Sequence, residues 1–575
     1  MSDDYASGSK VLSRSLQDDN FPIKWENDEE KNLMWWYDDL HVPKPVSPMY
    51  ATFCPWWDTD ATSSLSYMYR RFWAPFGKRW LGKIINGYVY TAVVPRDPQD
   101  AKLATSYYSS IIPFYADKFL KWWNDRLLPE VEGNLQYLDN YPYERASLKE
   151  LLYVLEESLD IFDRHWRLHW ILSLAQIQSF LQFKSVYKEI FGTIDEEEIG
   201  KILLSVDDKN WDSMEALWKL KNQIKQSVAL RKIFQEPKDK PAERTLHRLK
   251  LSSRGKKFLR SLSEYTRVYG NKSLYTHELI YPTWKENPAA VIQVLKGFLE
   301  IDYDYPKDLR RVKETRDLAI KKIFAKLSVG AGKKRLKEAL DLATKMAPLT
   351  PNHHFYFDQG THARIRRIFL EVGDRLTKAN IIDDREDIFL LTYDEMRALA
   401  VDCNAYDARK IVSNRKEEMK RQAELQPPDW VGTATQWATY EEPFKQNWGF
   451  PEKFERELGN VGVKEIRGIA ASPGVSEGIA RVVKSPEEID LVQPGEIMVC
   501  QMTNPSWYSV FPKLKALVAD AGGVLSHPAI ISREFGIPSV VGAAVGTRLI
   551  KSGQTIRVDG DKGVVSILDQ STSRN

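Results

Sequence analysis

A long run of apolar residues at helical spacing begins after Ser147 and sets the fold class of most of the chain. Its members follow one another in steps of four and three, which places them on one face of an α-helix. They are Leu148, Leu152, Leu155, Leu159, Phe162, Trp166 and His169. Ser147 followed by Glu150 forms a capping box, the pattern that opens such a helix. Similar stripes recur up to about residue 425, so we expect a large, mainly α-helical region.

The character of the sequence changes after this region. Residues 426–463 are rich in Pro and Gly and indicate a linker. In residues 464–572, short β-type runs such as EIMVCQM and TIRVDG alternate with glycine turns, which is typical of a compact α+β domain. Residues 1–60 combine aromatic residues with prolines and predict an extended segment. The sequence therefore predicts a multidomain chain, in which a helical domain over residues 61–425 precedes the α+β domain.

Composition excludes several classes of protein. The 82 basic and 79 acidic side chains give a net charge of +3, without the strong basic excess of a nucleic-acid binder. The three cysteines, Cys54, Cys403 and Cys500, lie too far apart in the sequence to suggest a zinc motif or a disulfide framework. No apolar run is long enough to cross a membrane, and the first residues lack the apolar core of a signal peptide. We expect a cytoplasmic protein with no nucleic-acid or membrane partner.

One histidine stands between a glycine pair and a predicted helix, in the segment GGVLSHPAIISREFGIPSVVG, residues 522–542. The glycines allow a tight turn, and Pro528 suits the first position of a helix. His527 would then lie at a helix N-terminus, where backbone amides and the helix dipole favour an anion, and Arg533 could add a positive charge. Neutral imidazole is a competent nucleophile, so this local chemistry allows a phosphohistidine as well as a simple capping histidine.

The whole segment resembles the phosphohistidine signature of the phosphoenolpyruvate-utilising enzymes, which include pyruvate phosphate dikinase, phosphoenolpyruvate synthase and rifampicin phosphotransferase. Pro528 and Ser532 stand where that signature usually has other small residues. The segments GIAASPGVSEGIARVV and VDGDKGVVSIL resemble the beginning and the end of the same domain. The resemblance implies a swivelling domain with a phosphohistidine intermediate on His527. It also implies that Gly523, Ser526 and Arg533 shape the pocket of that histidine.

The helical region resembles the substrate half of rifampicin phosphotransferase, above all in residues 362–400. Its order relative to the swivelling domain is similar to the larger subunit of phenylphosphate synthase, in which a separate subunit binds ATP. Residues 1–460 show no glycine-rich phosphate loop, and too few residues follow His527 for a barrel domain. The resemblance implies an ATP-grasp-type partner subunit that holds ATP and Mg²⁺, and a phenolic substrate. The products would be an aryl phosphate, AMP and phosphate.

Candidates for activating the acceptor hydroxyl lie in the segment NHHFYFDQGTHARIRR. On a helix, His354, Asp358 and His362 are spaced by four and share one face, so a carboxylate between two imidazoles could orient one of them as a general base. Capping residues at a helix start are the alternative. Three ligands at this spacing are weak grounds for a metal, and we predict no metal site. Arg364 either meets the incoming phosphate or belongs to a solvated basic face. His169 either lines the acceptor pocket or packs in the core.

Rival functions stay open at this point. The chain could be a phosphohistidine relay or regulatory protein that passes phosphate to another protein and has no small-molecule pocket. It could also be an idle scaffold, although such a scaffold is expected to lose the histidine or the glycine pair. An acceptor other than a phenol, such as an antibiotic with a hydroxyl group, fits the main hypothesis as well.

Overall fold

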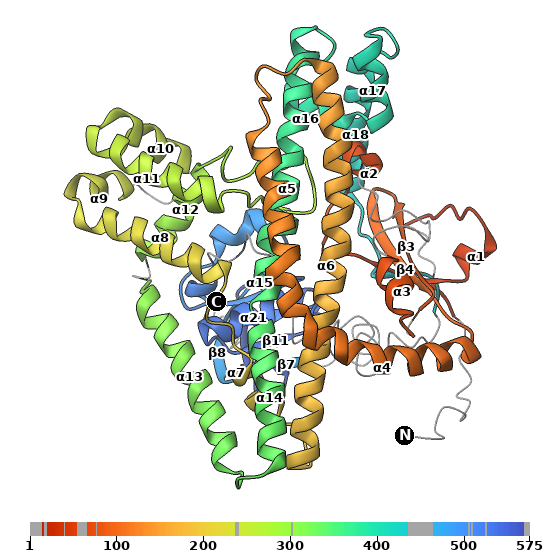
Figure 1. Ribbon diagram of the computed structural model, residues 1–575. Helices are drawn as coiled ribbons and strands as arrows, with labels where there is room; N and C mark the ends of the chain where they lie inside the picture. The colour runs from red at the N-terminus through yellow and green to blue at the C-terminus, as the bar shows by residue number, and fades with distance from the viewer. Residues whose placement is uncertain are drawn as a thin grey trace, which may run out of the picture.

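The computed structural model divides into an N-terminal sheet, a helical region and a C-terminal α/β domain (Figure 1). It describes residues 14–16, 20–39, 41–53, 66–75, 77–235, 241–300, 303–434, 464–503, 507, 510–523 and 526–568. None of the helices in these ranges combines the length and the apolar character that a membrane span requires. The mainly helical region followed by an α/β domain confirms the predicted fold class.

Five short strands form an antiparallel sheet in the order β1-β5-β2-β4-β3. They are β1 (Arg14–Leu16), β2 (Met34–Tyr37), β3 (Arg79–Ile85), β4 (Tyr88–Val94) and β5 (Trp430–Ala434). Asn86 and Gly87 join β3 to β4 with φ angles of 50° and 85°, as a tight two-residue hairpin turn requires. Strand β2 lies in the segment predicted to be extended, and β5 lies in the predicted linker, because their apolar side chains are buried together.

Three helices and a rod-like helical segment form the centre of the helical region. The longest helix, α6 (Leu148–Phe191), has 44 residues and begins with the predicted Ser147–Glu150 capping box, which confirms that prediction. Beside it runs a nearly continuous rod made of α14 (Ala331–Met346), α15 (Leu349–His353), a π-helical turn (His354–Gln359) and α16 (Gly360–Lys378) (Figure 1). We call this segment the α14–α16 rod. Helices α4 (Pro98–Trp122) and α5 (Leu128–Asn140) pack against α6 and α16.

The remaining helices surround this centre. Those after α6 are α7 (Glu196–Ile202), α8 (Lys209–Gln226), α9 (Val228–Phe234), α10 (Ala242–Leu251), α11 (Ser253–Tyr269), α12 (Ala289–Glu300) and α13 (Tyr305–Ala325). Helices α8 to α12 form a group of their own to one side of the rod (Figure 1). Helices α17 (Tyr393–Val401) and α18 (Ala408–Glu424) follow the rod. The irregular segment between α11 and α12 reaches the centre of the bundle and carries several polar side chains of the site described below.

The C-terminal domain contains an eight-stranded sheet in the order β6-β13-β12-β8-β9-β10-β11-β7. Its strands are β6 (Glu465–Arg467), β7 (Ile469–Ser472), β8 (Val475–Val483), β9 (Ile497–Cys500), β10 (Ala516–Ala519), β11 (Ser539–Val541), β12 (Thr555–Asp559) and β13 (Val564–Ile567). Strands β8 to β11 are parallel, and helix α21 (His527–Phe535) connects β10 to β11. His527 therefore follows the carboxyl end of a parallel strand, the edge at which such sheets bind ligands.

The C-terminal domain is docked on the helical region. Arg311 of α13 donates a hydrogen bond of 2.9 Å to the carbonyl oxygen of Glu534 in α21. Gln501 donates to the Asp39 carboxylate at 2.5 Å, and the rings of Tyr303 and Phe535 lie 6.1 Å apart. Apolar side chains of the domain also share one buried cluster with helices α8 to α12. This docking brings His527 toward the middle of the α14–α16 rod.

Candidate functional site

The turn between β10 and α21 fixes the position of His527. Gly522 has a φ of 107°, a conformation that favours glycine, and a Cβ at this residue would lie 2.5 Å from the Ser526 hydroxyl. Ser526 precedes the helix, and both its backbone N–H and its hydroxyl donate to the Gly523 carbonyl, at 3.0 and 2.7 Å. His527 is the first residue of α21, followed by Pro528. Gly523 and Ser526 therefore hold the backbone of this turn.

The two ring nitrogens of His527 have different surroundings. Nδ1 lies 2.9 Å from the Thr503 hydroxyl, and the Phe511 ring lies 6.0 Å from the imidazole. Nε2 is shielded from solvent and has no hydrogen-bond partner among the residues that the structure describes. Burial, together with the nearby groups His354 and Lys272, holds the pKa of His527 well below its usual value. The imidazole is therefore neutral near pH 7, and Nε2 is its open nucleophilic position.

Lys272 is the buried cation that acts on His527. It lies in the irregular segment between α11 and α12, and its amine donates to the Ser213 hydroxyl at 3.2 Å. The same amine lies 5.3 Å from the centre of the Trp284 ring. Burial lowers the pKa of Lys272 to about 8, so the ammonium form still predominates at neutral pH. A phosphoryl group on His527 would meet a fixed positive charge from the helical region.

Asp358, in the π-helical turn of the rod, is the centre of a group of histidines. His354 donates a hydrogen bond from Nδ1 to Asp358 Oδ2. His169 Nδ1 lies 3.5 Å from Oδ1, and the Nε2 atoms of His277 and His353 each lie 3.9 Å from Oδ2. We call these five residues the Asp358 cluster. Asp358 is 1% exposed, whereas 26% of the His354 side chain is exposed, so His354 is the member open to a ligand.

Burial and the neighbouring side chains determine which groups of this cluster are charged. Burial alone would raise the pKa of Asp358, but the surrounding imidazoles, above all His354, hold it well below the usual value. Burial lowers the pKa of His169 and holds those of His277 and His353 well below their usual value. The cluster therefore combines an ionised carboxylate with neutral buried imidazoles.

His362 occupies a different place from the one that its spacing predicts. Its Nδ1–H donates to the backbone carbonyl of Asp358 at 2.6 Å, and its Nε2 lies 3.1 Å from the Tyr50 hydroxyl. Both ring nitrogens are engaged, and neither contacts the Asp358 carboxylate. The imidazoles around the Asp358 carboxylate are therefore those of His354 and the other histidines of the Asp358 cluster, and not that of His362. His362 supports the backbone of the turn.

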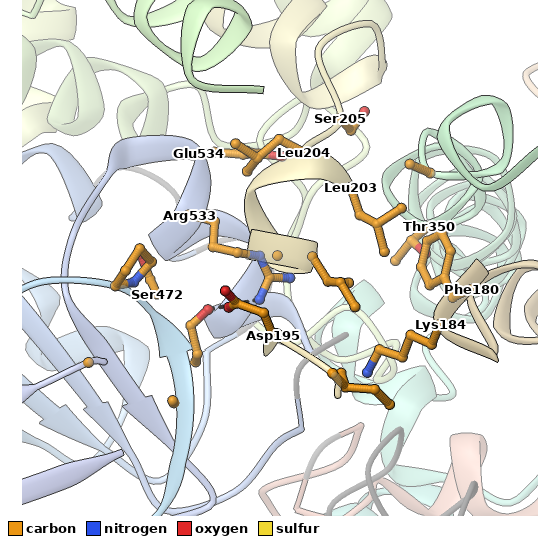
Figure 2. A pocket seen from close by; sticks show the side chains of 18 of the residues that line it. Phe180, Lys184, Asp195, Leu203, Leu204, Ser205, Thr350, Ser472, Arg533 and Glu534 are labelled. Carbon is orange, nitrogen blue, oxygen red and sulfur yellow. Dashed lines mark hydrogen bonds between the residues drawn. The ribbon is translucent and has the colours of Figure 1, made fainter. Parts of the chain in front are cut away.

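The two arginines predicted to take part in the site make hydrogen bonds to other parts of the chain. Arg364 donates to the Leu135 carbonyl at 3.2 Å and pairs with Asp139, both on α5, which corrects its predicted contact with the incoming phosphate. Arg533 donates to the Ala471 carbonyl at 2.8 Å. It lines a cavity of about 460 Å³ between α6, α7, α15 and the C-terminal domain, where its side chain extends toward Asp195 (Figure 2). His527 is not among the residues that line this cavity.

Several residues of the site were not predicted from the sequence. Lys272 and His277 lie in a segment without helical or strand periodicity, and Thr503 lies in a loop after β9. His353 was not predicted because regular α-helical spacing does not place it on the same face as Asp358. In the π-helical turn, residues five apart also meet, which adds His353 to Asp358. All nine histidines are described. His41 joins this region through ring contact with His277 at 5.2 Å, and His165 packs beside it, with its ring 5.5 Å from that of Phe357.

Comparisons with known proteins cover both parts of this site. Residues 492–563 match the family model described as the mobile domain of PEP-utilising enzymes. Residues 167–350 match the model described as the rifampicin phosphotransferase fourth domain. These ranges contain His527 on one side and His169, Lys272 and His277 on the other.

Relatives among curated proteins agree with these matches. The chain is 28% identical over 568 residues to chondramide synthase of Chondromyces crocatus, a match that covers 95% of this chain and 14% of that protein. It is 27% identical over 403 residues to an uncharacterised phosphotransferase of Bacillus subtilis, covering 70% and 47%. It is 29% identical over 324 residues to the rifampicin phosphotransferase of Bacillus cereus, covering 55% and 35%. The chain spans less than half the length of each relative.

These matches confirm the resemblance that the sequence motifs indicated. Residues 492–563 are thus similar to the mobile domain of PEP-utilising enzymes, and residues 167–350 are similar to the fourth domain of rifampicin phosphotransferase.

Proposed function

We propose that this chain is the phosphohistidine-carrying, substrate-binding part of an ATP-dependent phosphotransferase, with His527 as the carrier. The observation that supports this most is the neutral His527, whose buried Nε2 has no hydrogen-bond partner among the described residues and whose charge state responds to the nearby Lys272 and His354. The mobile-domain match and the relatives named as phosphotransferases support the same class. ATP and Mg²⁺ would be held by an ATP-grasp-type partner subunit.

In the first half-reaction, the Nε2 lone pair of His527 attacks a phosphorus atom of ATP. An N–P bond forms while a P–O bond of the nucleotide breaks. Nδ1 keeps its proton, and this N–H donates a hydrogen bond to the Thr503 hydroxyl oxygen, 2.9 Å away. The ring then carries a positive charge, and in the docked state the phosphoryl oxygens are stabilised by the ammonium group of Lys272.

In the second half-reaction, the acceptor oxygen attacks the phosphorus and the N–P bond breaks. His527 leaves as a neutral imidazole, because the proton on Nδ1 is already in place. The hydroxyl proton of the acceptor passes to Nε2 of His354, whose Nδ1–H is held by Asp358. The carboxylate stabilises the imidazolium that forms, so His354 and Asp358 act together as the general base.

A phenolic hydroxyl suits this arrangement. Trp166 lies with its ring 4.8 Å from that of His169 and 5.5 Å from that of His277, so an aromatic wall adjoins the cluster. A phenol loses its proton near pH 10, far more readily than an aliphatic alcohol, so an imidazole can serve as its base. A hydroxyl of an antibiotic is the second candidate, favoured by the relatives named rifampicin phosphotransferase. A relay to another protein has less support, because groups of the helical region, His354 and Lys272, already act electrostatically on His527 within this chain.

The carrier role is tested by treating the purified chain with phosphoramidate, a small donor that phosphorylates histidines without a partner protein. Peptide mapping by mass spectrometry should find an acid-labile phosphate on the His527 peptide of the wild type and none in His527→Ala. His247→Ala, which alters an exposed histidine on α10, should be labelled like the wild type. Equal labelling of His527→Ala and the wild type would contradict the proposal.

A further inference from the structure

Three buried groups of the Asp358 cluster come from distant parts of the chain and point at one another. His169 lies on α6, and His353 and Asp358 lie on the α14–α16 rod. Their exposed fractions are 5%, 5% and 1%. One ligand-type atom from each lies within 4.8 Å of the others. Such a group needs an explanation, because buried polar atoms normally find hydrogen-bond partners.

The separations within this group are too long for hydrogen bonds. His169 Nδ1 and Asp358 Oδ1 are 3.5 Å apart, and neither atom has a hydrogen-bond partner within the described ranges. His353 Nε2 and Asp358 Oδ2 are 3.9 Å apart. Direct N–H···O bonds are about 2.7–3.2 Å long. Two ligands bound about 2.1 Å from one zinc ion in a tetrahedron stand about 3.4 Å apart. The distance of 3.5 Å between His169 Nδ1 and Asp358 Oδ1 is closer to the second value.

The surrounding contacts prepare the ligand atoms. His353 Nδ1 lies 3.2 Å from the Leu349 carbonyl, an acceptor only, so this nitrogen carries the proton and Nε2 keeps its lone pair. Asp358 Oδ2 accepts the hydrogen bond of His354, which leaves Oδ1 for another partner. A backbone carbonyl behind a histidine and a hydrogen bond on the second carboxylate oxygen are the usual supports of metal ligands.

We propose that His169, His353 and Asp358 bind a divalent transition metal ion, with Zn²⁺ as the best fit. Two imidazole nitrogens and one carboxylate oxygen are ligands that Zn²⁺ accepts, and three protein ligands leave its fourth position open. A hydroxyl bound at that position would lose its proton more readily. The sequence predicted no metal site, because His169 lies on a different helix from His353 and Asp358.

Metal binding is tested on the full chain without ATP, partner or acceptor. The protein is dialysed against a weak chelator, loaded with Zn²⁺ and analysed by elemental mass spectrometry. The expected result is one zinc per chain in the wild type and at least a tenfold weaker affinity in His353→Ala and in His169→Gln. Loading with Co²⁺ should give the strong visible absorption of a four-coordinate ion, and both variants should lose it.

Matched controls separate this proposal from the proposed function. His165→Gln alters a buried histidine outside the cluster, and His247→Ala alters an exposed one, so both should bind one zinc. His527→Ala should also keep the metal while it loses phosphorylation, which would show that the two properties are independent. Circular dichroism and thermal unfolding show which variants remain folded. A wild type without stoichiometric Zn²⁺ or Co²⁺, or folded variants that keep the Co²⁺ spectrum, would overturn the metal site.

Discussion

At the residue scale, the site combines sequence neighbours such as His354 and Asp358 with residues far apart in the sequence, such as His169 and Asp358. The sequence motif identified His527 and its turn, because a local pattern of glycines and a helix start determines both. The spacing by four also predicted that His354 and Asp358 meet, and they do. It did not predict Lys272, His277 or the hydrogen bond of Thr503. Those contacts depend on how α11, α12 and the C-terminal domain pack. No local sequence pattern predicts this packing.

Thr503 is expected to keep the proton on Nδ1 of His527 during both half-reactions. Thr503→Val removes the hydroxyl at nearly constant volume. A hydrogen bond to a charged group contributes about 1.5–3 kcal/mol, so phosphoryl transfer should slow by about 10–100-fold. Thr503→Ser, which restores the hydroxyl, should recover most of the rate. Rapid-quench measurement of phosphohistidine formation and decay checks this, and an unchanged rate in a folded Thr503→Val protein would rule out the role.

His165 is expected to make the protein less stable in acid. Burial, with the nearby charges of Arg164 and Arg364, lowers its pKa to about 3, and its ring nitrogens bond to Thr361 and Asn134. In the unfolded chain the pKa is near 6.5, so below pH 6.5 the unfolded state binds one proton more. Stability is therefore lost as pH falls through 6.5, by about 1.4 kcal/mol per pH unit.

The matched comparison is His165→Gln, which cannot take up this proton. The free energy of unfolding of the wild type should fall more steeply than that of the variant between pH 6 and pH 5. Denaturant titrations at several pH values measure both slopes. Parallel slopes for the two proteins would show that His165 does not titrate on unfolding.

At the element scale, regular structure was predictable where the pattern is long. The apolar stripe and the capping box predicted α6 correctly, because an apolar stripe of this length fits only the period of an α-helix. The strand β5 was missed because five residues in a Pro-rich stretch give little signal without their partners β1 and β2. The π-helical turn was missed as well, because nothing local marks the one residue by which it departs from an α-helix.

The turn before α21 provides a prediction at this scale. Gly522 and Gly553 both have left-handed backbones, with φ of 107° and 91°, but only Gly522 has a neighbour that a Cβ would meet. Gly553→Ala should cost about 1–2 kcal/mol of stability from backbone strain alone. Gly522→Ala should cost more and should also slow the labelling of His527, because Ser526 must shift. Thermal unfolding and phosphoramidate labelling measure the two effects, and equal results for both variants would contradict this account of the turn.

At the scale of the whole molecule, the central feature is the docked C-terminal domain. It places His527 beside the helical region and leaves a cavity of about 460 Å³ on the Arg533 side. A carrier that also collects phosphate from an ATP site must leave this position, so its docking contacts must break when the domain moves. The hydrogen bond of Arg311 to the Glu534 carbonyl is one of them. A Cβ on Gly536 would lie 2.3 Å from this guanidinium, so the fit is close.

Arg311→Ala is expected to favour the undocked state. His527 would become more accessible to phosphoramidate, so labelling should be faster, whereas transfer to the acceptor should be slower. Arg310→Ala, which removes the same charge at the exposed neighbouring position, should change neither rate. Hydrogen exchange of the α21 amides should rise in the first variant only. Identical labelling and exchange in both variants would show that this contact does not hold the domain.

The most direct test of the central claim follows the phosphate from His527 to an acceptor in a single turnover. The chain is phosphorylated on His527, freed of donor and mixed with a phenol, and phosphorus NMR records the phosphohistidine and the product. An aryl phosphate should appear as the phosphohistidine decays, and His354→Ala should slow this step by at least tenfold without preventing phosphorylation. A phosphohistidine that yields only inorganic phosphate with phenols and other hydroxyl acceptors would contradict this prediction.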